Sequence, residues 1–366
     1  MGRPTLTTER LRLVPLAEEH APFVVAMNAD PEVMRFISGE AFPPERTMRS
    51  FPHWVADQEG LGFWAGFVAD EFVGVWGLIR EGEEAGVAEI AYRLPQTAWG
   101  RGLATEGSLA LLDHGFGAAG LTRVWSETMT VNVASRRVME HLGMTYERSH
   151  PGEAPTEGWE QGEVVLGIDR ATWAARRAAE TWDAEAPAFD EPADHGLRDP
   201  AVRAAWRDLL LDVLPSAPAR VADLGCGTGT LSLLLAEEGF DVEGVDVSPA
   251  MIELALAKRG DAERPTFRVG DAAAPDLDGR FDVVLCRHVL WALPNPVSAL
   301  LRWADLLGDG GRLVLVEGLW SNGAGLSAAE TLALLARAGR TGAVRPLPDA
   351  AYWGREITDE RYVVVS

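Results

Sequence analysis

The chain has 366 residues, a formal net charge of −22 at pH 7 and 47% hydrophobic residues. This length is typical of two domains of ordinary size, and the hydrophobic fraction excludes a disordered chain because it allows sizeable cores to be buried. The acidic balance disfavours nucleic acid or an anionic membrane surface as a partner.

Lysine and cysteine usage sets further limits on chemistry and compartment. Lys258 is the only lysine, so mechanisms that need a lysine Schiff base or a lysine general base have almost nowhere to occur. The two cysteines, Cys226 and Cys286, lie in separate motifs and are expected to be reduced thiols. No Cys/His cluster has the spacing of a zinc site, and no metal is predicted. The N-terminus lacks a charged region followed by an apolar one, and no apolar run reaches membrane length. We therefore expect a soluble cytoplasmic protein that does not bind a membrane.

The first half of the chain predicts a mixture of strands and helices. In chain order these are an edge strand at 8–16, helices at 18–28, 30–34 and 44–58, a hairpin with strands at 63–69 and 72–80, a strand at 88–94, a helix reaching about residue 116, a strand at 122–130 and a helix at 132–144.

A glycine turn separates the predicted strand at 88–94 from the helix that follows it. Its residues are Trp99, Gly100, Arg101, Gly102, Leu103 and Ala104. A strand that meets a glycine turn and a helix N-terminus here fits a pyrophosphate held by successive backbone N–H groups. The later helix at 132–144 begins at Asn132 and closes on a glycine that suits a C-cap.

These two stretches together resemble the GNAT acyltransferases, in particular the subfamily that acetylates N-terminal amines of ribosomal proteins. The resemblance covers about residues 6–177 and implies a mixed α+β sheet that uses acetyl-CoA. It implies that the turn from Trp99 to Ala104 binds the pyrophosphate and that Asn132 holds the pantetheine arm. In that subfamily, Ser135 occupies the place of the acid that reprotonates the leaving coenzyme thiolate.

The chain departs from the wider family at two positions. Trp99 stands where the family's loop usually has Gln or Arg, and Met139 stands where a tyrosine acid is common. The second departure is accommodated if Ser135 acts as the acid. Both departures leave open the alternative that this half is a non-catalytic binding module.

Acetyl transfer to an amine requires a base, because an ammonium cannot attack a thioester. Glu89, on the strand before the glycine turn, is the first candidate, acting directly or through a water; an exposed strand acid is the alternative. Glu153, Glu157 and Glu160 lie in a later turn-rich segment and are either bases or solvated loop charges.

A change of composition marks the domain junction. A predicted helix at 173–180 is followed by a Pro/Asp-rich bridge at 184–194. We therefore expect an acetyltransferase-like domain at 1–178 and a second domain at 179–366. The strand order differs between the halves, which predicts a fusion and not a duplication.

The second half is organised around an apolar strand at 221–224 that runs into a glycine-rich turn and then a helix at 231–236. The turn contains Gly225, Cys226, Gly227 and Gly229. This G-x-G-x-G spacing differs from the G-x-G-x-x-G of dinucleotide-binding folds, so a pyrophosphate is not implied. Glycines let a ligand approach the bare backbone. Asp223, just before them, suits a cationic ligand.

Further strands follow, and several of them end at or just before an acidic residue. They are predicted at 242–246, 266–269, 281–286, 311–317 and 362–365. Asp246 and Asp271 lie at or just past two of these strand ends. Acids at successive strand ends define a ligand crevice at the carboxyl edge of a parallel sheet.

From about residue 188 to the C-terminus, this ordered set of motifs resembles the class I S-adenosylmethionine-dependent methyltransferases. The resemblance implies a Rossmann-like doubly wound sheet that binds S-adenosylmethionine. The implied contacts are Gly225, Cys226, Gly227 and Gly229 with the methionyl portion, Asp223 with its ammonium side, Asp246 with the ribose hydroxyls, and Asp271 with the Ala272 N–H at the adenine edge.

The methyl acceptor is expected beyond the strand at 281–286. Arg287, His288 and Trp291 follow that strand and line the usual substrate side. His288 is the best base candidate, although a structural role at the start of a helix is the alternative. His195, in the segment before the helix at 200–214, is either a substrate contact or base, or a capping or loop histidine.

Taken together, the sequence predicts a bifunctional enzyme that transfers acetyl groups to an amine and methyl groups to a small-molecule acceptor. Two alternatives remain: a methyltransferase with a non-catalytic GNAT module, or an acetyltransferase that modifies protein N-terminal amines. Neither acceptor, nor the oligomeric state, follows from the sequence.

Overall fold

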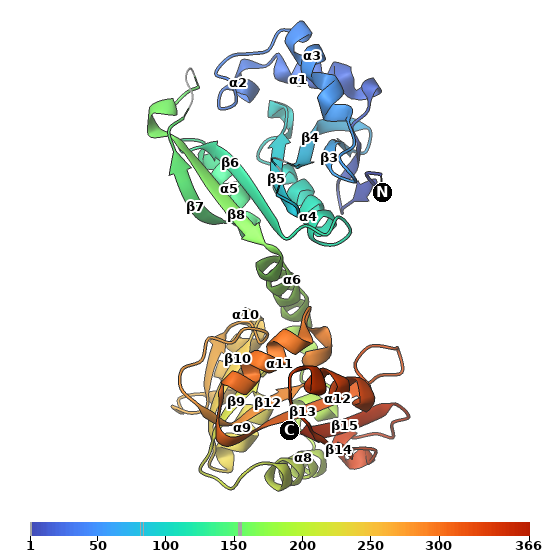
Figure 1. Ribbon diagram of the computed structural model, residues 1–366, viewed down its shortest axis with the longest axis vertical. Helices are drawn as coiled ribbons and strands as arrows, with labels where there is room; N and C mark the ends of the chain where they lie inside the picture. Colours follow the sequence, from blue (N-terminus) through green and yellow to red (C-terminus); the bar gives the residue numbers. More distant parts are fainter. Residues whose placement is uncertain (1, 81, 83, 153–155) are drawn as a thin grey trace. The chain divides into compact units, whose positions relative to one another are not determined.

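A computed structural model describes residues 2–80, 82, 84–152 and 156–366. The chain forms two compact units, Met1–Trp173 and Ala174–Ser366, each with its own sheet (Figure 1). The division falls within helix α6 (Arg170–Glu185), and the boundary at 178/179 expected from the sequence lies within the same helix. The predicted α/β class with two different sheets is confirmed.

The first unit contains an eight-stranded sheet in the order β1-β2-β3-β4-β5-β6-β8-β7. Its strands are β1 (Leu6–Thr7), β2 (Arg12–Pro15), β3 (Gly62–Val68), β4 (Glu71–Ile79), β5 (Val87–Arg93), β6 (Arg123–Met129), β7 (Thr145–His150) and β8 (Glu163–Asp169). Neighbouring strands are antiparallel except β5 and β6, which are parallel.

Helices cover both faces of this sheet. They are α1 (Ala21–Asn28), α2 (Pro31–Met34), α3 (Pro44–Val55), α4 (Leu103–Phe116) and α5 (Val133–His141). Leu111 of α4 and Met139 of α5 belong to a core that includes Trp76 of β4. Val24 of α1 and Phe51 of α3 belong to a separate core on the other face. Side chains on one face of the sheet are therefore directed toward α4 and α5, and those on the other face toward α1 and α3. The same division applies to the two sides of β5.

Two predicted elements of this unit are wrong in extent. The expected edge strand at 8–16 is broken, because the backbone N–H of Thr8 donates to the Leu11 carbonyl over 2.9 Å and turns the chain between β1 and β2. The helix expected at 44–58 ends at Val55, where Ala56 adopts an extended ψ of 133°.

The second unit contains a seven-stranded sheet in the order β11-β10-β9-β12-β13-β15-β14. Its strands are β9 (Arg220–Leu224), β10 (Asp241–Asp246), β11 (Thr266–Val269), β12 (Phe281–Arg287), β13 (Leu307–Leu319), β14 (Ala343–Pro346) and β15 (Glu360–Val365). Strands β9 to β13 are mutually parallel, and β15 and β14 complete the sheet in antiparallel pairs.

Helices lie on both faces of this second sheet as well. They are α7 (Ala193–Gly196), α8 (Pro200–Val213), α9 (Thr230–Glu237), α10 (Pro249–Arg259), α11 (Pro296–Asp305), α12 (Ala328–Arg337) and α13 (Ala350–Trp353). Two separate buried cores, one around Trp206 and one around Trp303, lie against opposite faces of the sheet. This arrangement is the doubly wound fold that the resemblance to class I methyltransferases implied.

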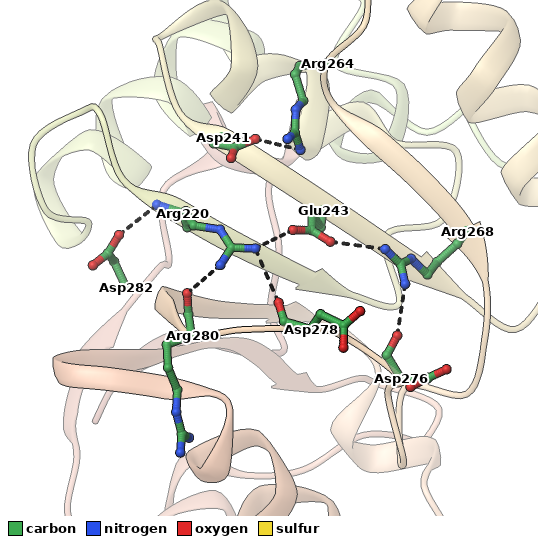
Figure 2. A network of polar contacts seen from close by, with 9 residues as sticks. All are labelled: Arg220, Asp241, Glu243, Arg264, Arg268, Asp276, Asp278, Arg280 and Asp282. Carbon is green, nitrogen blue, oxygen red and sulfur yellow. Dashed lines mark hydrogen bonds and ion pairs between the residues drawn. The ribbon is translucent and has the colours of Figure 1, made fainter.

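An ion-pair network joins the N-terminal ends of β9, β10 and β11 (Figure 2). The carboxylate of Glu243 accepts from Arg220 Nη2 over 2.6 Å and from Arg268 Nη2 over 3.2 Å. Asp241 pairs with Arg264 over 2.8 Å. The glycine turn follows the C-terminal end of β9, whereas Arg220 and Asp241 begin β9 and β10, so this part of the network lies away from the turn.

Within the described part of the chain, no helix is both long enough and apolar enough to cross a membrane.

Candidate active sites

Strands β5 and β6 form a wedge that opens toward their C-terminal ends. They pair only over Val87–Glu89 and Arg123–Trp125, although β5 continues to Arg93 and β6 to Met129. Backbone N–H and C=O groups along separated strands need other partners. The wedge can therefore accept an extended ligand that carries amide groups.

The predicted glycine turn follows β5 directly and leads into α4. Gly100 and Gly102 adopt positive φ values of 69° and 76°, and Gly102 is the N-cap of α4. The free N–H groups of the first helical turn can bind an anion there. The indole N–H of Trp99 donates to the Leu94 carbonyl over 2.8 Å. Trp99, where the wider family has Gln or Arg, therefore anchors the turn to the end of β5.

Beside this turn lies an open groove of about 730 Å³. Its lining residues are Glu9, Arg10, Gly102, Thr105, Glu106, Leu109 and His141. Arg10 Nη1 donates to the Arg101 carbonyl over 2.9 Å, and Arg10 Nε donates to Glu106 over 2.6 Å. The N-terminal segment thus supports the outer side of the turn.

Asn132 and Ser135 lie at the start of α5. Asn132 is the N-cap: its Oδ1 accepts from the Ser135 N–H over 3.2 Å, and its Nδ2 donates to Thr128 Oγ1 over 3.1 Å. The side-chain amide is therefore oriented by its own helix and by β6. Each amide atom keeps one further hydrogen-bonding capacity that a ligand can use.

The hydroxyl of Ser135 contacts Tyr92 of β5, a residue that the sequence analysis did not single out. The two hydroxyl oxygens lie 2.9 Å apart, and the tyrosine also lies 3.0 Å from the Ser135 carbonyl oxygen. Burial raises the pKa of Tyr92 to about 12, so its proton is retained at neutral pH. Met139, where the wider family often has tyrosine, is fully buried in the core.

The candidate bases have different surroundings. Glu89 is half-buried on β5, where its register partners are Ile79 and Trp125. Glu157 forms an ion pair with Arg35, whose hydrogen bond lowers the pKa of that carboxyl. Glu160 is exposed, and Glu153 lies outside the described residues. Glu89 is the described candidate that lies on a strand of the wedge.

Three side chains from β6, β7 and β8 form a polar cluster that the sequence analysis did not anticipate. Glu127, His150 and Glu163 each offer one possible ligand atom, all within 4.8 Å of one another. His150 Nε2 lies 2.9 Å from Glu127, and the hydrogen bond to this acid raises the pKa of the imidazole. This cluster places negative charge on the β6 side of the wedge.

In the second unit, the glycine turn lies between β9 and α9, and its backbone has the left-handed conformation that glycines allow. Gly225 and Gly227 have φ values of 76° and 54°, in the left-handed region. A Cβ on Gly225 would lie 2.2 Å from Val289, so a side chain cannot be accommodated there. The N–H groups of Gly225 and Cys226 both donate to the Val245 carbonyl, over 2.7 and 3.0 Å. The turn is thus fastened to β10.

Two predicted acids lie on either side of this turn. Asp223 accepts from Ser232 Oγ over 2.5 Å, and burial raises its pKa to about 6. Asp246 accepts from the backbone N–H groups of Gly227 and Ser248, each over 2.9 Å. Burial also raises the pKa of Asp246. The carboxylate of Asp246 therefore joins the turn to the segment before α10, while Ser248 is the N-cap of that helix.

Asp271 and Ala272 follow β11 as expected. Asp271 Oδ1 accepts from the backbone N–H of Ala273 over 2.8 Å. The carbonyl of Ala272 accepts from the indole of Trp303 over 2.7 Å. This short turn lies past the end of β11, and β11 pairs with β10, the strand that ends at Asp246.

Arg287 and His288 lie at the end of β12. Arg287 Nη1 donates to the Asp194 carbonyl over 2.7 Å, and its guanidinium lies over the Trp206 ring at 5.0 Å. His288 has a φ of 60°, which is uncommon for a residue with a side chain. Both of its ring nitrogens are buried without a hydrogen-bond partner among the described residues. Burial and Arg287 lower the pKa of His288 well below its ordinary value, so the ring is neutral.

Aromatic rings surround His288. The ring of Trp320 lies 5.2 Å and that of Trp353 6.2 Å from the imidazole, measured between centroids. Trp291 in turn lies 5.4 Å from Trp320 and is 36% exposed. The neutral imidazole is therefore set in an aromatic surrounding that reaches the surface at Trp291.

The segment before α8 is fastened to the glycine turn. Asp190 accepts from Thr228 Oγ1 over 2.6 Å and pairs with Lys258, the single lysine of the chain. The ring of Phe189 stacks on His195 at 4.6 Å. A Cβ on Gly227 would lie 3.0 Å from the Phe189 ring, so this ring lies directly against the turn. The ion pair with Lys258 was not predicted from the sequence.

Comparison with known families assigns a different family to each half of the chain. Residues 10–145 match an acetyltransferase (GNAT) domain, and residues 199–347 match a methyltransferase domain. The predicted combination of an acetyltransferase half with a methyltransferase half is confirmed.

Similar proteins agree with this division. The chain is 35% identical over 186 residues to FsC-acetyl coenzyme A-N(2)-transacetylase of Aspergillus fumigatus, with 47% of this chain and 79% of that protein covered. It is 36% identical over 114 residues to demethylmenaquinone methyltransferase of Renibacterium salmoninarum, covering 31% and 47% of the two chains. It is 35% identical over 138 residues to ubiquinone biosynthesis O-methyltransferase of Xanthomonas oryzae pv. oryzae, covering 37% and 54%. The chain thus spans about half the length of these two methyltransferases.

Proposed function

Because the chain belongs to the GNAT acetyltransferase family and carries a methyltransferase domain after the acetyltransferase domain, we propose that it is a bifunctional transferase. One unit moves an acetyl group from acetyl-CoA to an amine nitrogen. The other moves a methyl group from S-adenosylmethionine to a small-molecule acceptor. The free thiols of Cys226 and Cys286 support a reducing, cytoplasmic location.

The first unit fits acetyl-CoA at two places. The N-terminus of α4, opened by Gly100 and Gly102, suits a pyrophosphate. The wedge between β5 and β6, with Asn132 at its β6 side, suits the amide groups of the pantetheine arm. When bound there, acetyl-CoA supplies an activated acetyl thioester.

Proton handling in the first unit is assigned to three side chains. Glu89 takes the proton of the acceptor ammonium, because only the neutral amine is nucleophilic. Ser135 holds at Oγ the proton that the departing thiolate needs. Tyr92, 2.9 Å from that oxygen and protonated at neutral pH, can resupply it. This hydroxyl pair supports turnover over a binding-only role for the unit.

The second unit fits S-adenosylmethionine by charge and by shape. Asp223 and Asp246 are buried beside a turn whose glycines leave room for a ligand. Asp246 already accepts two backbone hydrogen bonds, but a carboxylate has about four lone-pair sites, so ribose hydroxyls can still be bound. When bound, S-adenosylmethionine supplies a methyl group on a sulfonium, and positioning and desolvation provide most of the catalysis.

His288 is the proposed base of methyl transfer. A buried, neutral imidazole without a partner can accept a proton from a hydroxyl or amine acceptor. The surrounding Trp320 and Trp353 suit an apolar, planar acceptor. The names of the two similar methyltransferases refer to quinones, which are also planar ring compounds.

The observation that carries the proposal is that each unit has a glycine turn between a strand and a helix, with chemically suited side chains beside it. The test incubates the protein with acetyl-CoA and a panel of small amines, and separately with S-adenosylmethionine and a panel of aromatic hydroxyl and amine compounds. Release of coenzyme A in the first mixture and of S-adenosylhomocysteine in the second is expected. Absence of one product with every acceptor would reduce the chain to a single activity.

A further inference from the structure

Arg93, the last residue of β5, has a guanidinium without an acidic partner. Its Nη1 donates to Asn28 Oδ1 over 2.6 Å, and its Cζ lies 5.3 Å from the centre of the Trp54 ring. The Nε is buried and has no acceptor among the described residues. Burial alone lowers the pKa of Arg93 to about 10, so the group remains charged at neutral pH and no described carboxylate compensates it.

Such an arrangement is costly in a folded protein. A charge that leaves water without a counter-ion destabilises the fold. The buried side chain of Arg3 in the same unit avoids this cost, because Asp57 lies beside it. Arg93 has no acidic partner among the described residues, and a bound anion would supply the missing negative charge.

The position of Arg93 directs it toward the proposed reaction site. Side chains alternate along β5, and Tyr92 reaches the α5 side of the sheet. Arg93 therefore lies on the opposite face, where Asn28 of α1 and Trp54 of α3 contact it and where Glu89 also lies. It follows the part of β5 that pairs with β6, and the residue is partly accessible to solvent.

Part of the guanidinium is unsatisfied. Nε is buried without an acceptor, whereas Nη2 has no hydrogen bond within the described residues and is the nitrogen that a ligand can reach. A guanidinium that donates from such a nitrogen suits a carboxylate oxygen. The other strand of the wedge, β6, carries the acid Glu127. Glu89 is in register with Trp125, and Glu127 is two residues further along β6, so Glu127 lies on the same face of the sheet as Glu89.

We propose that the amine acceptor of the acetyltransferase unit carries a carboxylate that binds the guanidinium of Arg93. The acceptor class is thus an amino acid or a related amino-carboxylate, with its ammonium toward the acidic β6 strand of the wedge. This inference rests on the proposed acetyl transfer, and it defines the acceptor that the transfer requires.

The test compares amino-carboxylates with their uncharged amides. Glycine, β-alanine and glutamate are offered beside glycinamide, β-alaninamide and glutamate 1-amide, the last keeping only its side-chain carboxylate. Binding is measured by calorimetry in the presence of coenzyme A, and turnover by release of coenzyme A from acetyl-CoA. At least one carboxylate is expected to have a Kd or KM about ten-fold or more below that of its amide, as one ion-paired contact allows.

Variants separate a binding role from a structural one. Arg93→Gln should remove the preference for the carboxylate, Arg93→Lys should restore part of it, and Arg12→Gln, an exposed arginine on β2, should leave it intact. Arg93→Met should keep or raise the Tm, because it removes an uncompensated charge. A lowered Tm in that variant together with an unchanged preference in Arg93→Gln would overturn the proposal.

The outcomes also distinguish this inference from the proposed activity. Arg93-dependent binding of a carboxylate without any release of coenzyme A would support the anion site and refute acetyl transfer to these compounds. Turnover that is equal for acids and amides and unchanged in Arg93→Gln would support acetyl transfer and refute the anion site. Failure of every carboxylate to bind in an Arg93-dependent manner also refutes it.

Discussion

The hydroxyl oxygens of Tyr92 and Ser135 lie 2.9 Å apart and join β5 to the first turn of α5. The contact bridges the wedge in which the acetyl donor is proposed to bind, and it places a protonated phenol behind the candidate acid. In the proposed mechanism, Ser135 and Tyr92 take the place of the tyrosine that the wider family often has at the position of Met139.

Replacement of Ser135 by alanine should lower kcat for acetyl transfer by roughly 10²-fold, within the range of acid–base groups. Tyr92→Phe should lower it less, because water can resupply the serine. The affinity for acetyl-CoA should change little in both variants. Steady-state kinetics and calorimetry check this, and an unchanged kcat in Ser135→Ala would move the acid role to water or to another residue.

Replacement of Asp246 by alanine should weaken binding of S-adenosylmethionine at least about ten-fold. The variant lacks the carboxylate that is proposed to accept hydrogen bonds from the ribose hydroxyls, and each such charge-assisted hydrogen bond is worth about 1.5–3 kcal/mol. The Tm should also fall, since the N–H groups of Gly227 and Ser248 lose their acceptor. A destabilised variant that binds the ligand normally would show that Asp246 only organises the turn.

The buried acid Glu317 should make stability depend on pH. One of its oxygens accepts from the Leu290 N–H over 2.9 Å, the other has no partner among the described residues, and burial raises its pKa to about 8. The folded state therefore holds a proton that the unfolded state releases above its ordinary pKa near 4.5. The contribution of Glu317 to stability should be fully present below that value and should be lost as pH rises toward about 8.

The variant Glu317→Gln should remove this dependence. At pH 8 it should be more stable than the parent protein by at least about 1 kcal/mol, with a much smaller difference at pH 5. Glu253→Gln, at an exposed position of α10, is the matched control and should behave as the parent protein at both pH values. Denaturant unfolding at each pH measures the difference, and equal effects at pH 5 and pH 8 would contradict the assignment.

The network in Figure 2 should contribute to the stability of the second unit. Glu243→Gln should lower the free energy of unfolding by about 1 kcal/mol, because a largely buried carboxylate that holds two arginines is worth more than a single exposed pair. Glu237→Gln, which removes one exposed partner of Arg203, should cost less than about 0.5 kcal/mol. Equal losses in the two variants would show that bridging has no added effect.

The sequence predicted those features that depend on neighbouring residues. The glycine turn after Asp223, the acid at the end of β10 and the glycine turn after β5 each follow from a strand, a turn and a helix in succession. The fold class could be predicted for the same reason. The edge strand at 8–16 was wrong because Thr8 and Arg10 bind Glu106, almost a hundred positions away, and this contact favours a turn.

Features that join distant parts of a unit could not be predicted. The pairing of Tyr92 with Ser135 needs the approach of α5 to β5, and the ion pair of Asp190 with Lys258 needs α10 beside the segment before α8. The lack of an acidic partner for Arg93 among the described residues could not be predicted either, because it depends on the contacts of all the acids in the unit. The one available signal for Tyr92 is its place on a strand that ends at the glycine turn.

The most direct test of the account is calorimetric titration of one protein sample with both donors. S-adenosylmethionine and acetyl-CoA should each bind at about one site, and saturation with one should leave the Kd of the other unchanged. The variant Gly225→Val, whose side chain would meet Val289, should lose only S-adenosylmethionine. Competition between the two donors, or failure of either to bind the parent protein, would contradict the presence of two independent transferase sites.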